Sequence, residues 1–356
     1  MAALSDNLMV CTVLVYLVAM LLHAAEYAFG DRGRIGSAAS APAPAPEREK
    51  ELVGAGGPAI AKASHGGYAA SAVAGAATGS DGPAGDGPAG GDAPGDGSAP
   101  RAGGSWAARL GFLAVVTTII GAAAHAGSVV TRGLAAERLP FGNMYEFVMA
   151  ITLLGVLVWL GTLLFQRQVR HLGLFVMLFE VLLVGVAGMI LHTPVGPLVP
   201  ALDSYWFAIH IGAVATSSSL FMIGGAASIM YLVRSGYDRG KRGFLHAYGG
   251  RLANAETVER LSFRLHAFAF PIWTFGVTAG AIWAEVAWGR YWGWDPKEVW
   301  AFISWVVYAG YLHARATPSI KRSTAAWIAV IGFLTMLMNL FGVNIFFTGL
   351  HSYGGV

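Results

Sequence analysis

Long apolar runs alternate with short polar segments over most of the chain. Eight runs are long enough to cross the hydrocarbon core of a membrane, which needs about 20 helical residues at a rise of about 1.5 Å each. The pattern therefore predicts an all-α, polytopic membrane helix bundle with eight transmembrane helices. The expected spans are Leu8 to Phe29, Trp106 to Val130, Asn143 to Phe165, Leu172 to Leu191, Tyr205 to Val233, Arg264 to Trp288, Glu298 to His313 and Thr324 to Phe347.

Residues 31–105 break this pattern. Ala, Gly, Pro and Ser occupy 53 of the 75 positions, and only five are Leu, Ile, Val or Phe. Such a segment cannot bury enough apolar surface to offset the entropy of ordering it. We expect a disordered linker there, between a first transmembrane helix in residues 1–30 and a seven-helix core in residues 106–356.

The composition agrees with a membrane protein, because 55% of the residues are hydrophobic and only 12% are charged. About 25% charged residues are usual in soluble domains. The net charge of +3 gives no reason to expect a nucleic-acid partner. Cys11 is the one cysteine in the sequence, so the chain has no dithiol redox centre, disulfide or cysteine metal cluster of its own.

Lysines and arginines predict the orientation, because they concentrate in cytoplasmic loops. With the N-terminus outside, 19 of the 23 positive residues fall on the cytoplasmic side, which then includes the linker. The four left outside are Arg132, Arg138, Arg290 and Lys297. We therefore expect a plasma-membrane protein with both termini external.

The predicted external loop at residues 288–300 has the sequence WGRYWGWDPKEVW. An aromatic belt at the membrane interface would explain any one of its tryptophans. It would not explain the intervening Gly289 and Gly293, nor the charged turn that follows. Closely spaced indoles can instead form a flat apolar platform for a large planar ligand. The expected platform residues are Trp288, Trp292, Trp294 and Trp300.

The charged residues of this loop suit the same ligand. Arg290 and Lys297 can meet anionic groups at the rim of the platform, and Asp295 lies within the motif. A porphyrin with two propionates fits that description.

Three separated motifs together resemble one family. The loop is similar to the tryptophan-rich WWD signature of haem-handling proteins, and its DPKE continuation resembles the CcsA/ResC branch of System II cytochrome c biogenesis. Pro140-Phe-Gly-Asn-Met-Tyr-Glu146 and Gly349-Leu-His-Ser-Tyr353 resemble two further motifs of that branch, in the family's order. The resemblance extends from about residue 106 to the end and leaves out the linker.

Two histidines are placed to bind haem iron. His351 lies four residues beyond the last predicted span, and His210 lies five residues into the fifth, near the same surface. Both can approach the tryptophan loop, and two neutral imidazoles on opposite faces are a common axial pair for haem. The resemblance implies the same roles, so we expect His210 and His351 to be both the iron ligands and the residues that carry the reaction.

A third histidine, His313, lies fifteen residues after Glu298 and therefore about 22 Å from the external boundary on a continuous helix. An ionisable ring at such depth is costly and is a candidate for function, although nearby Arg315 also allows an interfacial role. The resemblance implies a transmembrane haem ligand, paired with a histidine of a CcsB/ResB partner.

Other polar residues are weaker candidates. We expect structural roles for His125, His192 and Glu146, and a neutral or paired state for Glu180, which is expensive inside a span. His23 and His266 are expected at cytoplasmic ends of spans. The loop and linker histidines His65, His171 and His246 are expected to be solvated, while Asp203 and Glu285 can position external loops.

The resemblance implies a haem-binding subunit of a cytochrome c synthase. It would carry haem b across the membrane and present it for thioether attachment to the CxxCH motif of apocytochrome c. Three alternatives stay open: a membrane haem transporter, a System I haem lyase, and a b-type cytochrome linked to quinone. The last would need paired histidines at similar depth on facing helices.

Overall fold

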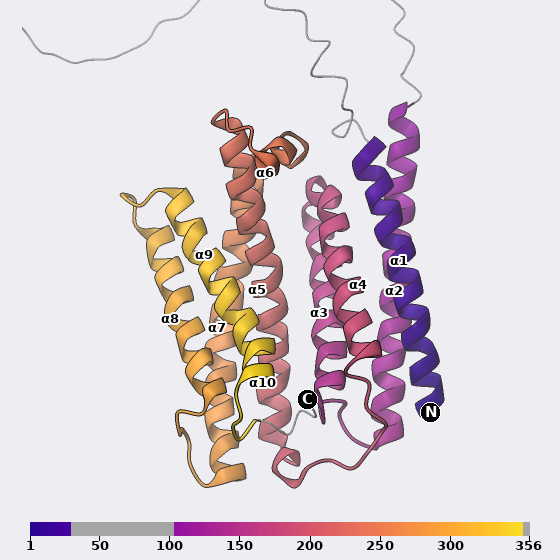
Figure 1. Ribbon diagram of the computed structural model, residues 1–356, viewed down its shortest axis with the longest axis vertical. Coiled ribbons are helices and arrows are strands. Elements are labelled where there is room, and N and C mark those ends of the chain that lie inside the picture. The colour runs from indigo at the N-terminus through magenta and orange to yellow at the C-terminus, as the bar shows by residue number, and fades with distance from the viewer. Residues whose placement is uncertain (30–102, 352–356) are drawn as a thin grey trace, which may run out of the picture. The chain divides into compact units, whose positions relative to one another are not determined.

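A computed structural model describes residues 1–29 and 103–351, and every regular element in these two ranges is helical (Figure 1). The prediction of an all-α protein is confirmed. The predicted linker and His65 lie outside the described residues, except that the second long helix already begins at Gly103.

Eight long helices account for most of the described residues. They are α1 (Ala2–Phe29), α2 (Gly103–Ala136), α3 (Met144–Phe165), α4 (Gly173–Met189), α5 (Tyr205–Asp238), α7 (Ala255–Trp288), α8 (Pro296–Ala316) and α9 (Arg322–Leu337). Shorter elements join them: η1 (Arg167–Leu172), η2 (Pro200–Leu202), α6 (Phe244–Ala247), η3 (Tyr248–Arg251), the π-helical η4 (Met338–Gly342) and α10 (Val343–Phe346).

Six of the described helices are long and apolar enough to cross a membrane. They are Ala2–Phe29, Trp106–Ala136, Met144–Phe165, Tyr205–Asp238, Ala255–Trp288 and Arg322–Phe346. The other two predicted spans are helical but less suited by these measures. Helix α4 has only 17 residues, and α8 has 21 residues that include Lys297, Glu298 and Arg315.

Local signals explain several helix ends. Helix α7 begins well before the predicted start at Arg264, because the Asn254 side chain accepts a hydrogen bond from Thr257 N–H and so caps it. Helix α3 begins where Asn143 accepts from the Glu146 N–H. Gly289 ends α7 in the left-handed conformation, with φ 70°, which a residue without Cβ adopts at little cost.

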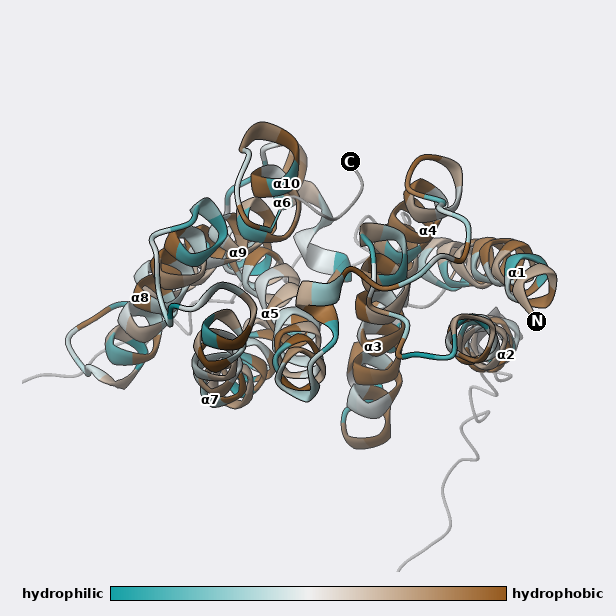
Figure 2. Cartoon of the chain, turned by 90° about the horizontal axis from the view of Figure 1, so that it is seen from below, coloured by the Kyte–Doolittle hydropathy of each residue, from teal (hydrophilic) through white to brown (hydrophobic). Residues whose placement is uncertain are grey.

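The helices form two packed groups. In one group α1 packs along α2 and against α4, and α3 packs with α4. In the other α5 packs along α7 and with α9, which also packs with α8. Contacts between α3 and α5 join the groups, which lie side by side in Figures 1 and 2. Any pocket between the groups is therefore walled by residues far apart in the sequence.

Hydrophobic residues, brown in Figure 2, are frequent along these helices, and many of them are exposed. Leu14 of α1, Leu164 of α3 and Ile331 of α9 are 57%, 78% and 50% exposed. Exposed aliphatic side chains on helices of this length suit contact with lipid chains.

Candidate functional site

A large cavity lies between the two helix groups, at the end of the bundle that holds the turn from α7 to α8. Its volume, including space open to solvent, is about 1060 Å³. We call it the tryptophan cavity. Three helices supply most of its lining: the start of α3 with the segment before it, the first half of α5 and the second half of α7. The turn into α8, η4 and the C-terminal segment complete it. The lining residues include Phe141, His210, Trp283, Trp288, Trp292, Lys297 and His351.

His210 reaches this cavity from α5. Its Nδ1 lies 2.7 Å from the Gly276 carbonyl oxygen of α7, so Nδ1–H donates and the basic nitrogen is Nε2. The ring stacks on Trp283, with centroids 5.8 Å apart and planes at 12°. Gly280 makes room for it, because a Cβ there would come within 2.6 Å of His210 Cε1.

His351 reaches the same cavity from the C-terminal segment. Its Nδ1 lies 2.8 Å from Asp295 Oδ2, and its ring lies edge-on to Trp288 at 5.0 Å and to Trp283 at 5.8 Å. Both histidines therefore contact the same indole. Histidines that bind a metal commonly donate their second N–H to a carbonyl or a carboxylate. His210 donates to a carbonyl oxygen and His351 to a carboxylate.

Asp295 connects the tryptophan loop to the C-terminal segment. Its other oxygen, Oδ1, accepts a hydrogen bond of 2.7 Å from Leu350 N–H. A Cβ at Gly349 would lie 2.5 Å from this oxygen, so the close approach requires glycine. Burial acts to raise the pKa of Asp295, but the hydrogen bonds from His351 and Leu350 hold the pKa below its ordinary value of 3.8. The carboxylate is thus ionised and able to orient His351.

The same aspartate caps α8. Asp295 accepts from the backbone of the first turn, and Glu298 Oε2 accepts from the N–H groups of Asp295 and Gly293, at 3.0 and 2.9 Å. This reciprocal arrangement is a capping box, and Pro296 begins the helix behind it. The DPKE sequence therefore fixes the loop and the start of α8 together.

The predicted aromatic residues divide into two sets. Trp288 and Trp292 line the tryptophan cavity, joined by Tyr291. Trp294 and Trp300 are not among its lining residues; Trp294 is 67% exposed and packs edge-on against Trp292 at 5.7 Å. Trp294 has φ 59°, an uncommon conformation for a bulky residue, which directs the chain into the Asp295 cap.

The two predicted cations also differ. Lys297 lines the cavity, and its Nζ donates to Asn344 Oδ1 at 2.7 Å. Arg290 is not among the lining residues and instead lies against Gly293. Of these two residues, Lys297 is therefore the one that lines the cavity.

His313 lies away from the tryptophan cavity. It sits in the last turn of α8, with an exposed side chain. The buried His23, His125 and His266 also lie outside the cavity lining. The exposed His192 donates from Nε2 to Asp6 Oδ1 at 3.2 Å.

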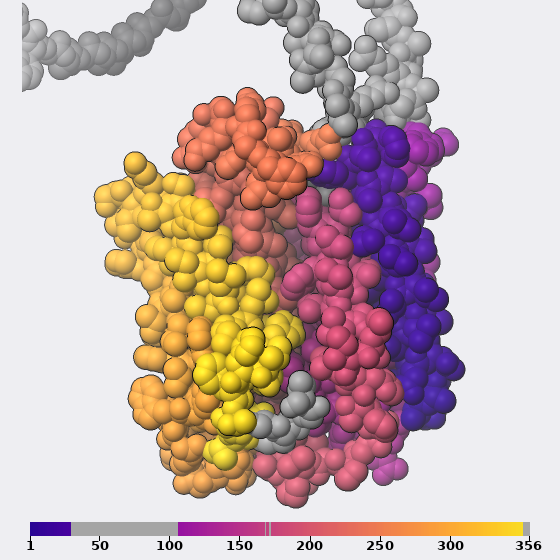
Figure 3. All heavy atoms as spheres, in the orientation of Figure 1, coloured from indigo at the N-terminus to yellow at the C-terminus, as the bar shows by residue number. Residues whose placement is uncertain are grey.

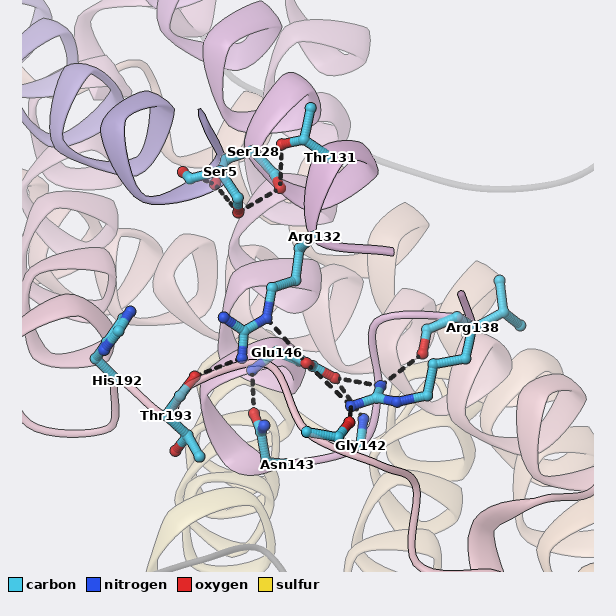
Figure 4. A network of polar contacts seen from close by, with 12 residues as sticks. Ser5, Ser128, Thr131, Arg132, Arg138, Gly142, Asn143, Glu146, His192 and Thr193 are labelled. Carbon is cyan, nitrogen blue, oxygen red and sulfur yellow. Dashed lines mark hydrogen bonds and ion pairs between the residues drawn. The ribbon is translucent and has the colours of Figure 1, made fainter. Parts of the chain in front are cut away.

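The Pro140–Glu146 motif has two parts: residues 141–144 line the tryptophan cavity, whereas Glu146 lies outside the lining and holds the local structure together. Glu146, whose side chain is fully buried, accepts from Arg132 and Arg138 at 3.0 and 2.7 Å and from Gly142 N–H at 2.7 Å (Figure 4). Arg132 also donates to the Thr193 carbonyl of the segment after α4. The structural role expected for Glu146 is confirmed, and two of the four predicted external cations are committed to it.

Several site residues carried no sequence signal. Trp283 and Trp273 line the cavity but lie inside an apolar helix, where a tryptophan resembles any core residue. Asn344 likewise looks like an isolated polar residue near a helix end. The glycine at position 280 could have pointed to a close helix contact, but not to a histidine 70 residues away in sequence.

Comparison with known proteins agrees with this geometry. Residues 141–351 match the family of the cytochrome C assembly protein, and these bounds are the first and last residues that line the cavity. Three similar proteins are each named cytochrome c biogenesis protein CcsA. That of Guillardia theta is 36% identical over 240 residues, covering 63% of this chain and 79% of the relative. That of Gloeobacter violaceus is 32% identical over 278 residues (64% and 82%), and that of Porphyra purpurea 31% over 277 (68% and 87%).

The family match covers more than half of the chain, and each of these relatives is matched over more than two thirds of its own length. The membrane-length helices fit the same assignment. The chain therefore belongs to the CcsA family and is a multi-pass membrane protein of cytochrome c biogenesis.

Proposed function

We propose that the tryptophan cavity binds haem b between His210 and His351 and presents it for attachment to apocytochrome c. The observation that carries this proposal is that both imidazoles are anchored through Nδ1 in the same cavity. Each donates Nδ1–H to a fixed acceptor, Gly276 O or Asp295 Oδ2, and each lines the same cavity. Such anchoring keeps Nε2 as the basic nitrogen, which is the form that coordinates iron.

The walls of the cavity suit a porphyrin. Trp283, Trp288 and Trp292 supply flat apolar surface, and Lys297 supplies one positive charge for a propionate. The protein would contribute binding and positioning, while the two thiols of a CxxCH motif in the substrate would add to the haem vinyl groups. Cys11, on the exposed surface of α1, has no part in this reaction.

The proposed topology has eight spans and places the cavity at the external face of the plasma membrane. The start of α1 and the turns after α2, α4 and α7 lie at one end of the bundle in Figure 1, as eight crossings require. The positive residues of the loops at the opposite end support a cytoplasmic location for that end.

His313 supports a role for a second subunit. Its side chain is exposed on α8 and lies outside the lining of the tryptophan cavity, so it is available to a haem held against another chain, which would supply the second ligand. We propose a CcsB/ResB-type protein as this partner, with haem held first near His313 and then in the tryptophan cavity.

Reconstitution tests the proposal. The full chain, its CcsB/ResB-type partner and an apocytochrome would be produced in cells that lack their own pathway, and covalent haem on the apocytochrome would be measured. Haem-loaded complex without covalent product would favour the transporter alternative.

In the same cells, His210→Ala and His351→Ala should change the haem absorption spectrum, whereas His192→Ala, outside the cavity, should not. Unchanged spectra in both cavity variants would disprove the ligand assignment.

A further inference from the structure

A second cavity lies deeper in the bundle, between the same two helix groups. Its volume, including space open to solvent, is about 660 Å³, and its walls come from α3, α4, α5 and α9. Along α3 it begins at Ile151, about one helical turn beyond Phe147, the last α3 residue of the tryptophan cavity. We call it the Glu180 cavity. Helices α4 and α9 adjoin on the face shown in Figure 3, and Phe175 of the lining is 37% exposed.

Glu180 is the one ionisable side chain among the described residues that line this cavity. It is 5% exposed, and its Oε2 is buried with no hydrogen-bond partner in the described part of the chain. Its Oε1 lies close to Gly155, where a Cβ would come within 2.6 Å. A charged carboxylate held this way would be very costly, so the group is a neutral acid with an O–H to donate.

The position of Glu180 gives its depth. It is the eighth of the 17 residues of α4, so roughly 10 Å of helix precedes it and roughly 14 Å follows it. Oε2 meets no hydrogen-bond partner among the described residues, and an apolar residue of similar size would avoid the cost of burying the carboxyl group. The acid therefore points to a ligand that accepts a hydrogen bond in the middle of the bilayer.

The remaining lining limits the chemistry of that ligand. Phe175, Phe179 and Phe333 provide three aromatic rings, and the rest of the wall is almost entirely aliphatic. Two hydroxyls, of Thr152 and Ser219, line the cavity with their protons committed to backbone carbonyls, at 2.6 and 2.9 Å. Their oxygens retain capacity to accept. A flat apolar ring with a carbonyl or hydroxyl at its edge satisfies all of these groups.

We propose that the Glu180 cavity binds the ring of a membrane quinone, with the Glu180 carboxyl donating to a ring carbonyl. Phospholipids also carry carbonyls, but their ester groups lie near the headgroups, at the edge of the hydrocarbon core. A quinone ring is not fixed to the interface and can reach the middle of a span. This inference is independent of where haem binds, since the two cavities have separate linings.

Photolabelling tests the site in the purified full-length protein. The probe is an azido-benzoquinone with a short alkyl chain, and decylubiquinone is the competitor. Labelled peptides from α4 and α9 should be found by mass spectrometry, and a hundredfold excess of competitor should reduce their labelling at least tenfold. Glu180→Leu should reduce it comparably, whereas Glu180→Gln, which keeps an N–H donor, should retain most of it.

Leu182→Ala is the matched control, because Leu182 lies two residues away on α4 but is 59% exposed and outside the cavity lining. Its labelling should equal that of the unaltered protein. Labelling spread over all lipid-facing helices, or unaffected by decylubiquinone, would overturn the proposal even if Glu180→Leu failed to fold. A phospholipid that copurifies in the cavity and resists displacement by decylubiquinone would also overturn it.

Discussion

Asp295 and His351 are 56 residues apart in the sequence, yet the carboxylate of the first lies 2.8 Å from the Nδ1 of the second. This contact makes the start of α8 and the C-terminal segment parts of one site. It also gives Asp295 two separable tasks, as the cap of α8 and as the acceptor that orients His351.

Substitutions at Asp295 should separate these tasks. Asn caps helices about as well as Asp, so Asp295→Asn should leave the unfolding temperature nearly unchanged. The asparagine side chain lacks the negative charge that orients His351. Haem affinity should therefore fall about 10- to 100-fold, as it does when the hydrogen-bond partners of other metal-binding histidines are changed. Asp295→Ala should lose both functions, with a cost in stability of about 1 kcal/mol. Haem titration measures the orienting task, and thermal unfolding measures the capping task. Equal haem affinity in the unaltered protein and in both variants would contradict the orienting role.

The space beside His210 provides a second prediction. Gly280→Ala would place Cβ within 2.6 Å of His210 Cε1 and should displace the ring, lowering haem retention severalfold. Gly161→Ala is the matched control, because a Cβ there meets no atom within 4 Å. That change should leave haem retention unaltered and stabilise α3 slightly, by up to about 1 kcal/mol. Haem retained per protein after purification measures both, and an equal loss in the two variants would argue against a specific effect on His210.

Lys297 and Arg290 should differ in their effects on haem binding. Lys297→Met removes the charge that lines the tryptophan cavity and should weaken haem binding by about 1 kcal/mol or more, whereas Arg290→Met should have little effect. The comparison should be repeated with haem dimethyl ester, which lacks anionic propionates. The difference between the variants should then shrink; a constant difference would show that Lys297 acts through packing.

The buried Glu146 network should dominate local stability. Glu146→Ala leaves the Arg132 and Arg138 guanidinium groups without their shared carboxylate, and breaking such buried pairs typically costs about 3–5 kcal/mol. Glu256→Ala removes only a surface pair with Arg260 on α7 and should cost at most about 0.5 kcal/mol. Unfolding in the same detergent measures both. A small effect at Glu146 would show that water replaces the lost carboxylate.

The sequence allowed much of the helical architecture to be predicted, because apolar runs of span length leave few alternatives to a helix. Its limits appear at α4 and α8. The first is short and the second carries charges, so length and composition alone do not make them clear spans.

The site was predictable where its residues form a local motif. Trp288, Trp292 and Lys297 were expected from one short stretch, and all three line the cavity. Trp294 was not distinguishable from them in sequence, because its exposure follows from a backbone turn with φ 59°. The hydrogen bond from His210 to Gly276 spans 66 residues, and no local pattern encodes such a contact.

The division of the helices into two groups has a thermodynamic consequence. The tryptophan cavity takes its walls from α3 on one side and from α5, α7 and α8 on the other, while direct contact between the groups depends largely on α3 and α5. A ligand that contacts both walls therefore adds to the interactions that hold the two helix groups together. At a free concentration one hundred times its Kd it would add about 2.7 kcal/mol to folding stability. The loaded protein should thus be the more stable of the two states, and unfolding should require a higher temperature when the ligand is present.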